Sequence, residues 1–435
     1  MDDEQKKNYY MNRNIKLYPT YLAFTWDIFF VWTIIMLFYT NVKGLSYSQA
    51  VLLDSILYIS AFILSVPLTK LFSKVKPILS MQIAVCCTMI FLIIVIFGNS
   101  FYEFVIAEII FSISMVVVNI KQSIILSDSL HAVKRDKEFN RIYGSGLGIY
   151  YFLDAVGAIF ATYIYQFNPY LAFILAFVIL IFVQLFSLLL KEPTKFQDSN
   201  LDLQQTQVKK KSVKPDSYKK ILLSGFILSM LVYLFFFRGV VSIDSSMLRI
   251  YLQGLTDGGV IPVWLFGILY SGYRIANSLS SKYQFKYELK FGVRSIVLFC
   301  ALAILCLVGT GVVYLINPSS ILSIVLILIM SYIFASLRPP NQIFMTKYLQ
   351  VCLTKKNLER GYNLKNMAEY LGYASFSSLY ALLLSVFNDN FGYSNLVYIA
   401  ILAVPLIISM IVFIKFLVKK YASKYTIIKA EYTED

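Results

Sequence analysis

Residues 77–98 read PILSMQIAVCCTMIFLIIVIFG, a run without a single charged side chain. A helix of about twenty such residues spans the hydrocarbon core of a bilayer, which is roughly 30 Å thick. Similar runs recur along the chain, so the sequence predicts about twelve transmembrane helices. The predicted spans are 17–40, 49–72, 77–98, 101–124, 142–166, 169–190, 220–243, 260–281, 292–316, 320–346, 362–387 and 391–418.

The composition agrees with a chain whose outer surface faces lipid. Of the 435 residues, 58% are hydrophobic and 14% are charged, whereas soluble proteins average about 45–50% apolar and about 25% charged residues. The sequence therefore predicts an all-α integral membrane protein. The first apolar run is long and lacks a small-residue cleavage site, so we expect it to be retained as a span.

The positive charges give a second test of this map. The chain carries 39 Lys and Arg residues and a net charge of +15. If the N-terminus lies inside the cell, most of them fall in inside loops, and only Lys43 and Arg249 fall in outside loops. We therefore expect both termini in the cytoplasm. The basic loops then face anionic lipid, and no nucleic-acid partner is expected.

A polar stretch divides the spans into six and six. Residues 191–220 read KEPTKFQDSNLDLQQTQVKKKSVKPDSYKK, a composition typical of a flexible linker. We expect an N-terminal six-helix half over 1–190, a cytoplasmic linker over 191–219, and a C-terminal six-helix half with a cytoplasmic tail over 220–435.

Polar and ionisable residues inside the spans define a candidate site. A charge at the centre of a membrane helix costs about 2.5 kcal/mol or more, so such residues are commonly functional. For any single residue, the alternative is a buried pair that only holds helices together. Our candidates for a substrate and ion pathway are Asp27, Glu108, Asn119, Asp154, Arg238, Arg274, Asn277, Arg338 and Glu369.

The chemistry of these groups suggests two roles. A carboxylate in an apolar site can take up a proton, so Asp27, Glu108 and Asp154 are candidate proton or cation sites. Arg238 and Arg274 are candidates for binding an anionic group of a solute or for pairing with those carboxylates. Arg338 and Glu369 lie nearer the predicted cytoplasmic ends, where long side chains reach the interface.

Several chemistries are excluded by the residues themselves. The one histidine, His131, falls in a predicted loop, so a His-pair metal motif and a Ser-His-Asp triad are both missing. The five cysteines form no Cys-x-x-Cys pair, and no ATP-binding motif occurs. We expect no enzyme activity, no catalytic residues, no cofactor and no metal.

The chain resembles the major facilitator superfamily in its two six-helix halves, basic central linker and cytoplasmic ends. Local sequence is similar to a bacterial branch of that family in Lys43–Gln49, Ala107-Glu108, Ser127–Leu130 and Phe139–Gly148. The resemblance implies a secondary transporter that works by alternating access around a central site. It also implies proton-coupled efflux of a small organic solute or peptide. We expect a monomer in a bacterial cell membrane.

One loop departs from the family pattern. Members usually carry Gly-x-x-x-Asp-x-x-Gly-Arg between the second and third helices, whereas Thr69, Ser73 and Lys76 replace the Gly, Asp and Gly here. Because that loop takes part in gating in the family, its change favours a non-transporting sensor or scaffold as one alternative. The intramembrane arginines favour another alternative, the import of an anionic nutrient.

Overall fold

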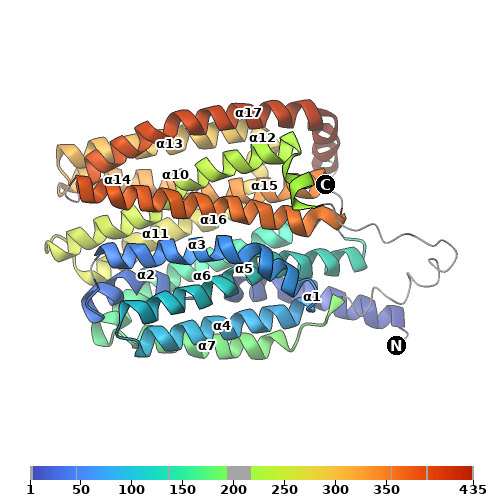
Figure 1. The fold of residues 1–435 in the computed structure, drawn as a ribbon, viewed down its shortest axis with the longest axis horizontal. Helices are drawn as coiled ribbons and strands as arrows, with labels where there is room; N and C mark the ends of the chain where they lie inside the picture. Colours follow the sequence, from blue (N-terminus) through green and yellow to red (C-terminus); the bar gives the residue numbers. More distant parts are fainter. Residues whose placement is uncertain are drawn as a thin grey trace.

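The computed structural model describes residues 3–45, 47–135, 138–193, 217–353, 355–387 and 390–433. Within these ranges the regular secondary structure is helical throughout. The helices lie lengthwise along the long axis, with α1 to α7 on one side of the molecule and α10 to α17 on the other (Figure 1). The start of α1 and the end of α17 lie at the same end of the bundle (Figure 1).

The N-terminal part of the chain supplies seven α-helices and one short π-helix. They are α1 (Asp3–Thr25), α2 (Val31–Leu37), η1 (Phe38–Val42), α3 (Tyr47–Phe72), α4 (Pro77–Phe97), α5 (Phe101–Ala132), α6 (Phe139–Phe167) and α7 (Leu171–Ser187). Large apolar side chains from all of these helices form one core cluster.

The C-terminal part supplies the remaining helices. They are α9 (Tyr218–Leu222), α10 (Gly225–Asp257), α11 (Val263–Lys282), α12 (Gln284–Phe291), α13 (Arg294–Ile316), α14 (Ile321–Ala335), α15 (Arg338–Cys352), α16 (Lys355–Val386) and α17 (Phe391–Thr433). Two further core clusters form here. The predicted linker 191–219 falls mostly outside the described residues, so the proposed division into halves stays a prediction.

Length and composition confirm an all-helical membrane protein. Among the described residues, seven helices are long and apolar enough to cross a membrane, and Val31–Val42, Leu171–Ser187 and Gly225–Val241 are shorter apolar helices. The predicted span 17–40 covers α1, α2 and η1, and every other predicted span falls on one helix or on two consecutive helices. Apolar side chains such as Phe97 and Ile321, which are 75% and 82% exposed, cover the outer surface, as expected where lipid replaces water as the solvent.

Two helices extend beyond the spans predicted from hydropathy. The first helix begins at Asp3, well before residue 17. On its polar part, Asn14 donates to Lys191 O (2.7 Å) and accepts from Lys191 N (3.0 Å). The helix predicted to end at 243 continues to Asp257. Arg249 therefore lies in a buried helical position and not in an outside loop, because its guanidinium faces the protein interior.

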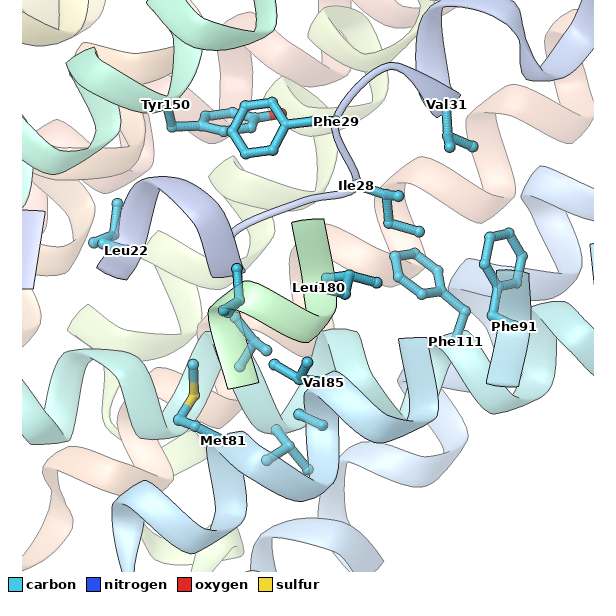
Figure 2. Packing of buried hydrophobic residues seen from close by; sticks show 14 of the residues in the cluster. Leu22, Ile28, Phe29, Val31, Met81, Val85, Phe91, Phe111, Tyr150 and Leu180 are labelled. Atoms are coloured by element: carbon cyan, nitrogen blue, oxygen red, sulfur yellow. The ribbon is translucent and has the colours of Figure 1, made fainter. Parts of the chain in front are cut away.

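The helix of the first span is broken in its middle. Residues 26–30 are not helical, and Phe30 has a φ of +68°, a backbone region that non-glycine residues rarely adopt. Figure 2 shows Ile28 and Phe29 on this irregular stretch, with the ring of Tyr150 beside that of Phe29 at 6.2 Å between centroids. A backbone break at membrane depth is tolerated only where protein or a cavity surrounds it.

A second break separates α14 from α15. Pro339 and Pro340 follow Arg338 at the start of α15, and proline has no N–H with which to continue the hydrogen-bond ladder of α14. Arg338 is therefore held at the first position of a new helix. The two breaks lie in different parts of the chain, and each carries a charged residue, Asp27 or Arg338.

Candidate functional site

A cavity of about 150 Å³ lies between the two groups of helices. It has room for several water molecules or a small solute. Its wall combines both helix breaks with side chains of α3, α5, α6, α10, α11 and α16. Its charged lining residues are Asp27, Asp54, Arg238, Arg249, Arg274, Arg338 and Glu369. Six of our nine candidates line it: Asp27, Asn119, Arg238, Arg274, Arg338 and Glu369.

Asp27 sits on the break between α1 and α2. Its Oδ1 accepts hydrogen bonds from Ile28 N (2.9 Å) and from Trp32 Nε1, and its Oδ2 accepts from Tyr150 OH (2.9 Å). Both carboxylate oxygens are thus held by neutral donors. A change of charge on Asp27 would therefore act directly on the hydrogen bonds that shape the break.

Arg274 and Asp154 connect the two groups of helices. Arg274 Nε on α11 lies 2.7 Å from Asp154 Oδ2 on α6, and both side chains are buried. The contact is a close ion pair, and neither atom has a hydrogen-bond partner among the described residues. The guanidinium also lies over the ring of Tyr270, 5.3 Å from its centroid. Asp154 itself does not line the cavity, whereas Arg274 does.

Two other arginines are less fully paired. The Nε atoms of Arg238 and Arg338 are buried and have no hydrogen-bond partner among the described residues. Arg238 lies over the ring of Tyr373 at 5.8 Å, and Tyr373 stacks on Tyr58 with centroids 3.8 Å apart. Since a buried guanidinium normally has its donors satisfied, these two side chains are suited to receive an anionic group.

Two further candidates on the cavity wall are already bonded. Glu369 Oε1 lies 3.1 Å from Lys365 Nζ, one turn away on α16. Asn119 Nδ2 on α5 donates to Tyr370 OH on α16 (2.7 Å). The second of these bonds joins the two groups of helices, so Asn119 helps to close the wall of the cavity.

Besides Asp154, two other candidates lie outside the lining. Glu108 is buried on α5, where its Oε1 accepts from Tyr39 OH (3.2 Å) and its Oε2 has no hydrogen-bond partner among the described residues. Asn277 donates to Tyr273 O (3.0 Å) within its own helix. Asn277 is buried on α11 but meets protein and not the cavity.

Sequence reasoning missed Asp54 and Arg249. Asp54 lies on α3 and lines the cavity, although nothing in its flanking sequence separates it from an interfacial residue. Arg249 Nη1 donates to Trp32 O (3.0 Å), a carbonyl on α2 of the other group of helices. A longer predicted seventh helix would have placed Arg249 inside the membrane and marked it as a candidate.

The two groups of helices touch on both sides of the cavity. Along α3 and α16, Ser378 Oγ contacts Ser55 Oγ (3.3 Å) toward one end, and Asn363 Nδ2 contacts Ser65 O (3.4 Å) toward the other. Along α6 and α11, Ser278 Oγ donates to Gly148 O (2.9 Å). These contacts place the cavity in the middle of the interface between the two groups.

Two glycines of α6 face α11 across this interface, where an added Cβ would be in ordinary van der Waals contact with α11. A side chain at Gly148 would meet Ser278 O at 3.7 Å, and one at Gly144 would meet Ser281 O at 3.6 Å. Among the described residues, no group of three or more His, Cys, Asp and Glu side chains is placed to hold a metal ion.

Comparison with known proteins gives the family. Residues 17–375 match the Major Facilitator Superfamily, so the chain belongs to that superfamily of membrane transporters, which are not enzymes. No curated protein sequence matches the chain. Among the solved structures that match is the nucleoside transporter NupG, with a TM-score of 0.66 and 12% identity over 92% of this chain and 100% of that one. This likeness shows the fold alone.

Proposed function

We propose that this secondary transporter carries a small organic anion across the membrane, coupled to protons, with export as its direction. The observation that supports the anionic substrate is the charge of the central cavity, where four arginines and three carboxylates are among the lining residues. Export rests on the resemblance to a bacterial branch of the family and not on geometry.

The arginines divide into paired and available groups. Arg274 is neutralised by Asp154, and Arg249 is bonded to Trp32 O. Arg238 and Arg338 have buried Nε atoms without hydrogen-bond partners among the described residues. A carboxylate or phosphate of the solute would supply charge-assisted acceptors to both, and such hydrogen bonds are about twice as strong as neutral ones.

The remaining lining favours a solute with a flat apolar part. Trp26, Trp32, Tyr58, Tyr270 and Tyr373 are among the residues that surround the cavity. Aromatic faces bind planar groups by stacking and exclude water from the neighbouring charges. We therefore expect an amphipathic anion, with its charged group at Arg238 and Arg338 and its apolar part against these rings.

Asp27 is our first proposal for the proton site, and Glu108 is the second. Asp27 lies on a broken helix beside the cavity, a position that commonly binds coupling ions in secondary transporters. Protonation would remove the negative charge that its three donors stabilise. The break, and with it the contact between α2 and Arg249, would then rearrange as the proton moves.

A ligand screen followed by transport assays tests the proposal. Purified protein is heated with panels of organic anions, cations and neutral solutes, because a ligand of the native state raises its melting temperature. We expect stabilisation by anions only, lost in Arg338→Gln and retained in Lys74→Gln, an exposed control. Stabilisation by cations alone, or an unchanged anion response in Arg338→Gln, would contradict the anionic site.

The import of an anionic nutrient is the alternative, favoured by the same arginines. Proteoliposomes loaded with the anion distinguish the two directions. Export predicts that an imposed proton gradient drives the anion opposite to proton flow, whereas import predicts movement in the same direction as the proton. Asp27→Asn should abolish the dependence on the gradient in either case while keeping anion binding.

A further inference from the structure

A groove on the outer surface of the molecule lies between α10 and α17. Its lining is apolar, whereas that of the central cavity is charged. The groove encloses about 530 Å³, and its walls include Gly225, Val232 and Phe236 on α10 and Pro405, Ile408 and Phe416 on α17. Ile408 is 57% exposed and Phe416 is 40% exposed. Because the outer surface of a membrane protein is apolar throughout, the distinguishing feature of this place is its concave shape, which can hold an apolar chain.

The groove offers its occupant no free polar group. Only two of its lining residues, Ser229 and Ser409, carry a polar side chain. Ser229 Oγ donates to Phe226 O and Ser409 Oγ donates to Leu406 O, both at 2.8 Å and both within their own helices. A hydrocarbon chain therefore fits the groove better than a polar solute or a peptide backbone.

Length and shape point to a single acyl chain. Gly225 and Phe236 are eleven residues apart on one helix, which gives about 16 Å along the axis. That is roughly half of the 30 Å hydrocarbon core, the depth of one leaflet. Gly225 makes the end of the groove narrow, since even a Cβ there would meet Phe416 Cε1 at 3.1 Å.

Positive charge lies at that same end. Lys415 is exposed, precedes Phe416 and follows Val412 by three residues, which places it on the groove side of α17. Lys219 is exposed on α9, which ends just before α10 begins at Gly225. The start of α10 adds the partial positive charge of a helix N-terminus. The apolar span of α17 ends at Val418, so these lysines lie at the level of lipid headgroups.

We propose that this groove binds an anionic phospholipid, with one acyl chain between α10 and α17 and its phosphate against Lys219 and Lys415. The site is separate from the transport cavity and does not depend on the proposed substrate. A bound lipid would join α10, which lines the cavity, to α17, which does not. The amount of anionic lipid in the membrane would then change how freely α10 moves.

Native mass spectrometry of the full-length protein tests the site. Phosphatidylglycerol and phosphatidylcholine with identical chains are added to delipidated protein. We expect one retained phosphatidylglycerol per chain and at least a fivefold preference over phosphatidylcholine. Ile408→Trp fills the groove and should lower retention of both lipids more than tenfold. Val325→Trp, an equally outward-facing change on α14, should leave retention unaltered.

A charge variant separates the headgroup from the chain. Lys219→Glu with Lys415→Glu should remove the preference for phosphatidylglycerol while phosphatidylcholine still binds and is still blocked by Ile408→Trp. Melting curves without lipid check that each variant is folded, and Val404→Trp serves as a second groove-filling change. Equal loss in Val325→Trp, no loss in either groove variant, or a dimer held by this face in place of lipid would overturn the proposal.

Discussion

At the scale of single residues, the Asp154–Arg274 pair shows how much depends on one contact. The two charges are buried, 2.7 Å apart, and come from α6 and α11. A buried ion pair adds little net stability because each ion loses its hydration, but removing one partner leaves an uncompensated charge and costs about 3–5 kcal/mol. The pair therefore fixes how the two groups of helices meet.

Neutralising one member of this pair should lower the melting temperature of the purified protein. We expect Asp154→Leu to destabilise strongly, because the guanidinium of Arg274 stays buried without its partner. The double change Asp154→Leu with Arg274→Leu should recover most of the loss, since neither charge then remains. A double variant no more stable than Asp154→Leu would show that Arg274 acts chiefly through its contact with Tyr270.

At the scale of helices, the start of α4 has a carboxylate beside it although the loop before it lacks the acidic residue usual in the family. The predicted loop between the second and third spans lacks the usual acidic residue, but Glu192, which follows α7, places Oε1 3.0 Å from Ile78 N at the start of α4. A carboxylate at a helix N-terminus is favourable. Asn14 holds the neighbouring Lys191 in position from α1. The negative charge at the start of α4 is thus supplied by Glu192, from the segment after α7, and not by the loop before α4.

Glycine at 267 is required by the close approach of α11 to α6. A Cβ at Gly267 would lie 2.7 Å from Ala158 O and would also overlap the side chain of Thr162. We expect Gly267→Ala to lower the melting temperature and the transport rate by forcing the helices apart. Gly254→Ala is the matched control, because that exposed helical glycine has open space around it. Alanine there should be neutral or stabilise by up to about 1 kcal/mol.

At the scale of the whole molecule, the cavity lies between contacts on both of its sides. Ser55 and Ser65 of α3 touch Ser378 and Asn363 of α16, and Tyr58 between them lines the cavity. In alternating access the two groups of helices rock about the central site. Each pair of contacts must therefore open in turn if a solute is to enter and leave.

A disulfide across one of these contacts should stop transport. Ser55 Oγ and Ser378 Oγ are 3.3 Å apart, close enough for a Ser55→Cys, Ser378→Cys pair to be linked with little movement. We expect oxidation to block uptake and efflux in proteoliposomes, and a reductant to restore both. The single-cysteine variants, in a background without the native cysteines, are the controls. Full transport by the cross-linked protein would contradict opening at this contact.

The sequence alone determined the class of structure. Hydropathy is a local property, so apolar runs such as 77–98 locate membrane helices without knowledge of their neighbours. The high cost of a charge in lipid singled out Asp27, Arg238 and Arg274 in the same way. The six-and-six pattern and the local matches then indicated the superfamily, which the family comparison confirmed.

Only the tertiary structure decided which of these groups act together. Helix periodicity gives the face on which a residue lies but not the direction in which that face points, because this depends on packing against other helices. The sequence therefore predicted that Arg274 could pair with a carboxylate but not that the partner is Asp154. It also did not predict that Glu108 lies outside the cavity lining or that Asp54 and Arg249 belong to it. The break beside Asp27 likewise requires the surrounding protein that shields its backbone from lipid.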